Sequence, residues 1–211
     1  MLVDDHPLVR DALTTLIEQN HTMRICGWAA CSSEALAFME KQCPDMALVD
    51  ISLKGSNGIE LIKGMLSLRK GFPILAISMH DENLYAERVF RAGGKGYITK
   101  DSESEQILKA ITTVLSGKHY FSPTIQSKIY DRLWSGEMGK ALNSIDSLTD
   151  RELEILQLIG RGIRTGAIAS QLKISIKTVE TYRSKLKEKL GVQDGAQLVK
   201  YAVEWAGRNA L

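Results

Sequence analysis

The 211-residue sequence predicts an α/β domain, built as a (βα)5 doubly wound parallel sheet, followed by an all-α domain of four helices. Up to position 116, short β-branched runs alternate with amphipathic stretches, which is typical of a parallel sheet covered by helices. After position 148 only helical periodicity remains. The two parts also differ in formal charge, which is −3 over 1–116 and +4 over 148–211.

The first domain, 1–116, is expected to contain five strands, each followed by a helix. We expect the strands at 1–3, 24–28, 46–51, 74–78 and 96–98. We expect the helices near 7–19, 33–41, 59–68, 82–92 and 103–115. Pro7 suits a first helical position, and Ser102-Glu103-Ser104-Glu105 has the pattern of a capping box. Because only three residues precede the first acidic pair, we expect a trimmed chain start or, less favoured, a shortened central strand.

The remaining chain is expected to form a linker and a helical domain. Residues 117–147 have weak periodicity, with one helix expected near 123–134. The helical domain, 148–211, starts at a capping box of Thr149 and Glu152. Two helices joined by a tight turn are expected around position 173, which is the pattern of a helix-turn-helix.

The composition excludes several classes of protein. Hydrophobic residues make up 44% and charged residues 25%, which is close to globular averages and unlike disordered or collagen-like chains. The apolar runs are too short for a bilayer span and the start is no signal peptide, so we expect a soluble, cytoplasmic protein. Cys26, Cys31 and Cys43 have neither disulfide nor zinc-ribbon spacing, and we expect reduced thiols.

Polar residues gather at the carboxyl ends of the expected strands, where doubly wound sheets bind ligands. Converging carboxylates need a cation, and oxygen ligands of this kind suit Mg2+. A carboxylate screened in this way can accept a phosphoryl group, while a lysine and a hydroxyl contact the phosphoryl oxygens. An acidic pair alone more often marks a helix entry, but the joint placement favours a site. The residues concerned are Asp4, Asp5, Asp50 as acceptor, Ser78 and Lys100.

These segments resemble the receiver domain of two-component response regulators. The matching pieces are VDDHPLVR (3–10), PDMALVDISLKGSNGIEL (44–61), FPILAISMHD (72–81) and AGGKGYITKD (92–101). The resemblance implies that Asp50 is phosphorylated and that Asp5, Asp50 and the Ser52 carbonyl bind Mg2+, with Asp4 just behind them. It also implies that Ser78 moves toward the phosphoryl group while Tyr97 turns inward. Ser52 and His80 flank the expected water path, and we expect them to tune the lifetime of the aspartyl phosphate.

The helical domain carries a basic stretch. Residues 175–191 contain five basic and two acidic side chains, which favours a nucleic-acid backbone, although a solvated helix face is the alternative. Residues 148–192 resemble the LuxR-type helix-turn-helix of NarL/FixJ response regulators. The resemblance implies that helix 176–190 enters the major groove, with Glu180, Thr181 and Ser184 toward base edges. The residues expected nearer the phosphates are Lys177, Thr178, Tyr182, Arg183, Lys185 and Lys187.

The expected function is that of a DNA-binding response regulator. A cognate histidine kinase would phosphorylate Asp50, and a homodimer would bind promoter DNA, with RNA polymerase as a candidate partner. The unphosphorylated receiver would obstruct the recognition helix until phosphorylation frees it through residues 117–147. Catalysis would be limited to slow self-dephosphorylation. One alternative is a phosphorylation-independent regulator with a degenerate receiver. Another, an aspartate-nucleophile phosphatase, is disfavoured because position 52 is Ser and not the Asp that such enzymes need.

Overall fold

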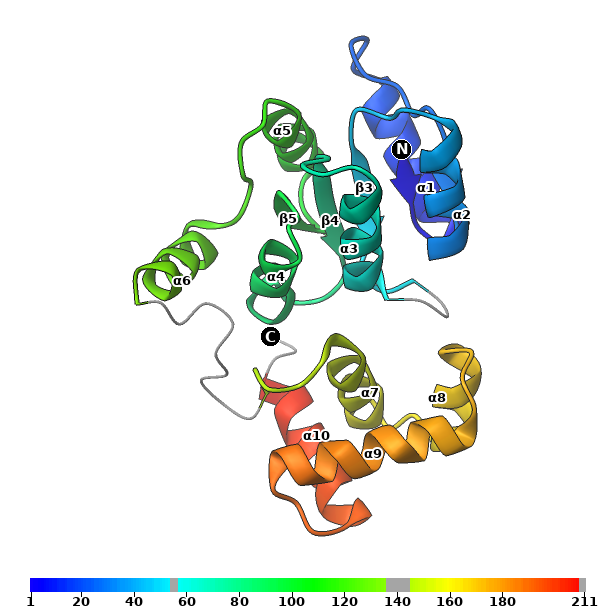
Figure 1. The fold of residues 1–211 in the computed structure, drawn as a ribbon, viewed down its shortest axis with the longest axis vertical. Coiled ribbons are helices and arrows are strands. Elements are labelled where there is room, and N and C mark those ends of the chain that lie inside the picture. Colours follow the sequence, from blue (N-terminus) through cyan, green and yellow to red (C-terminus); the bar gives the residue numbers. More distant parts are fainter. Residues whose placement is uncertain (54–56, 136–144, 209–211) are drawn as a thin grey trace. The chain divides into compact units, whose positions relative to one another are not determined.

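The computed structural model describes residues 1–53, 57–135 and 145–208 (Figure 1). The chain divides into two compact units, Met1–Gly136 and Glu137–Leu211. Positions 136–144 of the expected linker and the last three residues lie outside the described residues.

The first unit is built on one five-stranded parallel sheet. Its order is β2-β1-β3-β4-β5, so the direction in which strands are added reverses between β1 and β3. This reversal leaves the carboxyl ends of β1 and β3 side by side and open, which is where such sheets bind ligands. The strands are β1 (Leu2–Val3), β2 (Trp28–Ala29), β3 (Ala47–Asp50), β4 (Ile74–Ser78) and β5 (Gly96–Thr99).

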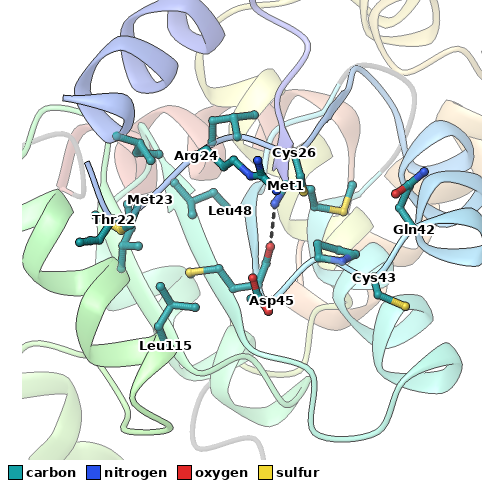
Figure 2. Close-up of a pocket in the computed structure, with 15 residues that line it drawn as sticks. Met1, Thr22, Met23, Arg24, Cys26, Gln42, Cys43, Asp45, Leu48 and Leu115 are labelled. Carbon is teal, nitrogen blue, oxygen red and sulfur yellow. Dashed lines mark hydrogen bonds between the residues drawn. The ribbon is translucent and has the colours of Figure 1, made fainter. Parts of the chain in front are cut away.

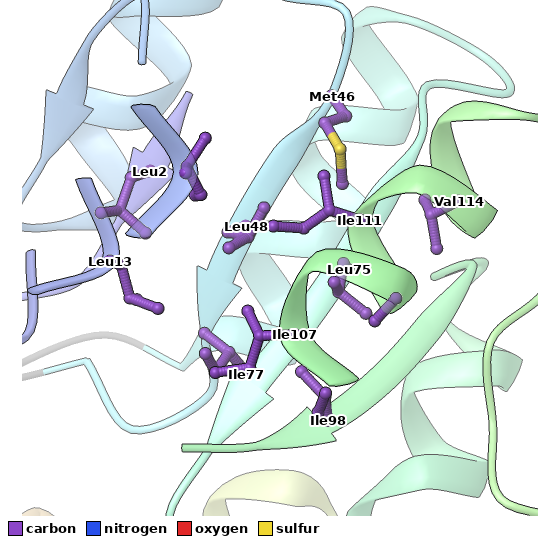
Figure 3. Packing of buried hydrophobic residues seen from close by; sticks show 12 residues of the cluster. Leu2, Leu13, Met46, Leu48, Leu75, Ile77, Ile98, Ile107, Ile111 and Val114 are labelled. Carbon is purple, nitrogen blue, oxygen red and sulfur yellow. The ribbon is translucent and has the colours of Figure 1, made fainter. Parts of the chain in front are cut away.

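Helices cover the sheet on both sides, because the buried strands are apolar on both faces. One face packs against α1 and α5 (Figure 3). Leu48, Leu75 and Ile77 point to this face, and because side chains alternate along a strand, Val49 and Ala76 point to the other. The helices of this unit are α1 (Pro7–Glu18), α2 (Ser32–Lys41), α3 (Gly58–Leu68), α4 (Glu82–Arg91), α5 (Ser104–Leu115) and α6 (Pro123–Trp134).

Two local predictions are wrong. The second strand is limited to Trp28–Ala29, because β1, its neighbour in the sheet, offers two residues to pair with. The Ser102–Glu105 pattern is not a capping box, because α5 begins at Ser104 and its N-cap Glu103 makes no side-chain cap hydrogen bond. The Ser102 hydroxyl instead lies 2.9 Å from the Thr99 hydroxyl at the end of β5.

The helix α6 packs on α4 and is therefore part of the first unit. Its residues Ile125 and Ile129 are buried. Polar contacts join α4 to α6 and its N-cap: Ser122 Oγ donates to Glu82 at 2.7 Å, Lys128 Nζ to Asn83 at 2.7 Å, and Arg132 to Glu87 at 2.5 Å. The first unit thus extends about one helix beyond the expected boundary at position 116.

A pocket of about 380 Å³ lies at the amino ends of β1 and β3, the opposite end of these strands from Asp4 and Asp50 (Figure 2). The Met1 amine donates a 2.8 Å hydrogen bond to the Met46 carbonyl there, and burial lowers the pKa of this amine. Cys26 and Cys43 line the same pocket. All three cysteines have free thiols, as predicted.

The second unit is helical. The capping box of Thr149 and Glu152 is confirmed, and the flanking Leu148 and Leu153 are buried. None of the described helices is long and apolar enough for a membrane crossing. The helices are α7 (Asp150–Gly160), α8 (Thr165–Gln171), α9 (Ile176–Leu190) and α10 (Gly195–Arg208).

Candidate functional site

The acidic residues lie together at the carboxyl ends of β1 and β3. Asp4 and Asp50 are 0% and 1% exposed. The Asp4 backbone amide donates to the Ala29 carbonyl, which extends the strand geometry into the loop. The Arg10 guanidinium donates to the Asp4 carbonyl at 3.0 Å and holds the loop against α1. The two ends of adjacent parallel strands therefore bring both carboxylates into one place.

Lys100 joins these carboxylates. Its Nζ lies 2.7 Å from Asp4 Oδ2 and 2.7 Å from Asp50 Oδ2, and its side chain is 8% exposed. The Lys100 amide donates to the Ser78 carbonyl. The pairing between β4 and β5 therefore continues as far as Lys100 and orients its backbone. A largely buried ammonium thus bridges two buried carboxylates at the carboxyl ends of the strands.

Burial and the neighbouring charges act in opposite directions on the pKa values of Asp50 and Lys100. It raises the pKa of Asp50, and the nearby Lys100 and the Ser52 amide offset the rise only in part. Burial also acts to lower the pKa of Lys100, but Asp50 and Asp4 outweigh it, so that this pKa is raised. The lysine therefore stays charged, and the buried Asp50 carboxylate is costly to keep ionised with one cation alone.

The oxygen atoms fit a hard divalent cation. Asp4, Asp5, His6 and Asp50 each offer one ligand atom, and these atoms all lie within 4.8 Å of one another. The Ser52 amide donates to Asp50 Oδ1 at 3.0 Å. The Ser52 hydroxyl oxygen is buried and has no hydrogen-bond partner among the described residues, so the site holds unused polar capacity. Three carboxylates around one point are a donor set for Mg2+ or a similar ion.

Ser78, Tyr97 and His80 form a connected group beside Asp50. The Ser78 hydroxyl accepts a 3.1 Å hydrogen bond from the His80 amide. Tyr97 is 2% exposed and lies inside the unit, where its hydroxyl donates to the His80 carbonyl at 2.7 Å. Burial raises the pKa of Tyr97. The His80 ring stacks on Tyr85 of α4 with centroids 5.0 Å apart, so the group reaches the helix that holds α6.

The helix α9 has the position and bounds expected of a recognition helix. The tight turn before it passes through Lys173, which has a positive φ of 51°, and Ser175 caps the helix by accepting from the Thr178 amide at 3.0 Å. Val179 and Leu186 face the core. Glu180, Thr181 and Ser184 are exposed, and their spacing puts them on one side of the helix.

Two of the basic residues of α9 form ion pairs within the protein. Lys189 Nζ lies 2.7 Å from the buried Glu152 and 3.1 Å from the Ser147 carbonyl, so this charge is part of the fold. Arg183 forms an ion pair with Glu180 at 3.6 Å. Lys177 and Lys185 are exposed, while Thr178, Tyr182 and Lys187 are partly buried.

His6 is a residue that the sequence argument missed. Its Nδ1 lies 3.3 Å from both Asp4 Oδ1 and Asp5 Oδ1. A signal was available, because a histidine directly after two aspartates at a strand end is a cluster of ligand types.

Comparison with known proteins agrees with this geometry. Residues 1–112 match the family model described as the response regulator receiver domain. Residues 146–202 match the model for bacterial regulatory proteins of the luxR family. The chain is 30% identical over 210 residues to the response regulator UvrY of Escherichia coli strain K12, covering 100% of this chain and 95% of that protein.

Two further proteins are similar to the chain over almost its whole length. The oxygen regulatory protein NreC of Staphylococcus aureus strain JH9 is 32% identical over 208 residues, covering 97% of this chain and 96% of that protein. RcsB from Salmonella enterica serovar Typhimurium, in a structure bound to promoter rprA with the phosphomimetic BeF3-, shares the fold. Its TM-score is 0.62 at 23% identity, with 96% of each chain covered. The chain belongs to the response regulators of the NarL/FixJ type, with a receiver domain followed by a LuxR-type DNA-binding domain.

Proposed function

We propose that a cognate histidine kinase phosphorylates Asp50 and that this modification controls the binding of promoter DNA by α9. The observation that carries the proposal is the ion pair of Lys100 with Asp50 and Asp4 at 2.7 Å each. Burying charged groups of this kind costs free energy, so a purely structural role does not explain them well. A phosphoryl acceptor, in contrast, needs a carboxylate beside a fixed cation.

Mg2+ would be held by Asp5, Asp50 and the Ser52 carbonyl, with Asp4 behind them, and would supply positive charge for the phosphoryl oxygens. In the chain itself, an oxygen of Asp50 forms a bond to phosphorus while the bond from phosphorus to the kinase histidine breaks. Lys100 lies close enough to Asp50 to pair with the phosphoryl group that Asp50 then carries.

Ser78 and Tyr97 would change position or hydrogen bonding when Asp50 is phosphorylated. The Ser78 hydroxyl, which accepts from the His80 amide, can rotate to donate to a phosphoryl oxygen. His80 holds Tyr97 through its carbonyl and Tyr85 through its ring. A shift of the His80 backbone would therefore reach α4.

Ser52 and His80 would tune the lifetime of the aspartyl phosphate, which the protein hydrolyses slowly. Ser52 is next but one to Asp50 and contacts it through its amide. The His80 ring is held by stacking on Tyr85. If a Ser52/His80 double substitution left the rate of dephosphorylation unchanged, this role would be wrong.

A homodimer would bind paired half-sites on promoter DNA, with RNA polymerase as a further partner. The structure of RcsB bound to promoter rprA supports the binding of promoter DNA for a protein of the same fold. Base edges would meet Glu180, Thr181 and Ser184. Phosphates would meet Lys177, Thr178, Tyr182, Arg183, Lys185 and Lys187.

The test is the intact mass of the protein after incubation with Mg2+ and a small acyl-phosphate donor. We expect a Mg2+-dependent gain of about 80 Da, the mass of one phosphoryl group. Asp50→Asn should abolish this gain. Asp45→Asn, at an exposed aspartate before β3, is the matched control and should retain it. No gain in the unsubstituted protein would contradict the proposal and favour phosphorylation-independent regulation.

A further inference from the structure

His6 places an imidazole beside the acidic pocket. Its Nδ1 lies 3.3 Å from Asp4 Oδ1 and 3.3 Å from Asp5 Oδ1. His6 is the N-cap of α1, but its side chain caps no backbone amide of the helix. The side chain is 51% exposed, so ions in solvent can reach the ring.

The loop around His6 is well held. The His6 amide donates to Asp4 Oδ1 at 2.8 Å, and Arg10 donates to the Asp4 carbonyl at 3.0 Å. Pro7 then restricts the backbone at the first helical position. These contacts fix the direction in which the imidazole leaves the main chain.

The spacing of the ligand atoms suits one shared ion. The four atoms from Asp4, Asp5, His6 and Asp50 lie within 4.8 Å of one another. Donors on opposite sides of an octahedral ion with bonds of roughly 2.1 Å are about 4.2 Å apart, so small movements suffice. Beside these atoms, the Ser52 amide donates to Asp50, and the Ser52 hydroxyl oxygen is buried with no hydrogen-bond partner among the described residues.

The mixture of ligand types decides which ion is preferred. Mg2+ favours oxygen ligands and keeps several waters, whereas an imidazole suits first-row transition ions. A site with carboxylates and one imidazole therefore favours ions such as Mn2+ or Fe2+ over Mg2+ more strongly than a site with carboxylates alone.

We propose that His6 Nδ1 is a direct ligand of the cation in the acidic pocket and that it raises the preference of this receiver for Mn2+ or Fe2+ over Mg2+. The inference rests on the proposed function, because it concerns the cation that assists phosphorylation of Asp50. According to this proposal, the residue that follows the two aspartates determines which ion the receiver prefers.

The experiment uses the full chain with Mn2+ as the probe. Electron spin echo envelope modulation detects nitrogen bound directly to Mn2+, and titrations of the free Mn2+ signal, with and without competing Mg2+, give both affinities. We expect nitrogen modulation in the unsubstituted protein and its loss in His6→Ala. The ratio of Mn2+ to Mg2+ affinity should fall about tenfold in this variant.

Two further variants complete the test. His6→Asn keeps a good N-cap residue without an imidazole, so it should fold normally and also lose the nitrogen signal. His21→Ala removes an exposed histidine after α1 and should change neither readout. The proposal is overturned if nitrogen modulation is missing in the unsubstituted protein, persists in His6→Asn, or if the affinity ratio does not change. The intact-mass measurement with Mg2+ tests phosphorylation separately: if phosphorylation fails, no mass gain is seen, whatever the result with Mn2+.

Discussion

Glu152 is a carboxylate that the fold buries and pairs completely. It is 2% exposed, it accepts from the Thr149 amide at 2.8 Å, and it lies 2.7 Å from Lys189 Nζ. Burial acts to raise its pKa, but these partners outweigh burial and lower the pKa below its ordinary value of 4.5. One side chain thus links the start of α7 to the end of α9.

This pairing predicts how the stability of the second unit depends on pH. A depressed pKa means that the carboxylate contributes stability above its unfolded pKa of 4.5, and that this contribution disappears as the pH falls through the lower folded pKa. Glu152→Gln should therefore reduce the free energy of unfolding by roughly 1–3 kcal/mol at pH 7. The difference between the two proteins should shrink below pH 4.5, as measured by urea unfolding across this range. A difference that is constant with pH would contradict the ion pair.

At the scale of elements, the start of α3 constrains the acceptor strand. A Cβ at Gly58 would lie 2.3 Å from the Asp50 carbonyl oxygen and 2.6 Å from Ile51 Cα. Asn57 caps the same helix by accepting from the Ile59 amide at 2.9 Å. The helix can approach the end of β3 this closely only because its first residue has no side chain.

Gly58→Ala should therefore displace the end of β3, which carries Asp50. We expect a loss of about 1–3 kcal/mol in the unfolding of the first unit, together with slower phosphorylation from an acyl-phosphate donor. Gly64→Ala, in the same helix, is the control because its Cβ would make only a 3.4 Å contact with Leu36. Equal stability and phosphorylation rates in both variants would show that the approach at Gly58 does not matter.

Substitutions on α9 should affect either the affinity for DNA or the sequence preference, depending on the residue that is changed. Lys185 is exposed on α9, and loss of one phosphate contact should lower the salt dependence of binding by about 0.9 in the logarithmic slope. Lys185→Ala should thus weaken binding to all DNA sequences alike, whereas Glu180→Ala should change which sequence is preferred. Binding measured at several salt concentrations on a set of related operators tests both. An unchanged slope would remove Lys185 from the phosphate contacts.

The elements differ in how well the sequence predicted them. The Asp4, Asp50 and Lys100 positions were predictable, because the carboxyl ends of parallel strands have to meet and these residues follow apolar runs. The extent of the second strand was not predictable from its own residues, because the two-residue β1 limits its pairing. The pairing of Lys189 with Glu152 was also missed, since two residues 37 positions apart in helices meet only through tertiary packing.

At the scale of the whole molecule, α6 ties the end of the receiver to α4. The contacts of Glu82, Asn83 and Glu87 with α6 begin directly after the His80 and Asp81 segment. Any movement of α4 that follows modification of Asp50 would therefore act on the start of the chain that leads to the second unit. Through these contacts, phosphorylation of Asp50 could release the recognition helix from the obstruction that we expect in the unphosphorylated protein.

The obstruction can be tested by removing the receiver. The second unit should be produced as 137–211, because the Ser147 carbonyl and Leu148 are part of its fold. If the unphosphorylated receiver obstructs α9, this fragment should bind operator DNA more tightly than the unphosphorylated full chain, by about tenfold, which is an ordinary coupling energy of ~1.4 kcal/mol. Phosphorylation of the full chain should raise its affinity for operator DNA to that of the fragment, and Asp50→Asn should prevent this rise.

The fragment with Lys185→Ala controls for binding through other surfaces. If the fragment binds no better than the unphosphorylated chain, obstruction is wrong, and phosphorylation would have to act by bringing two recognition helices together.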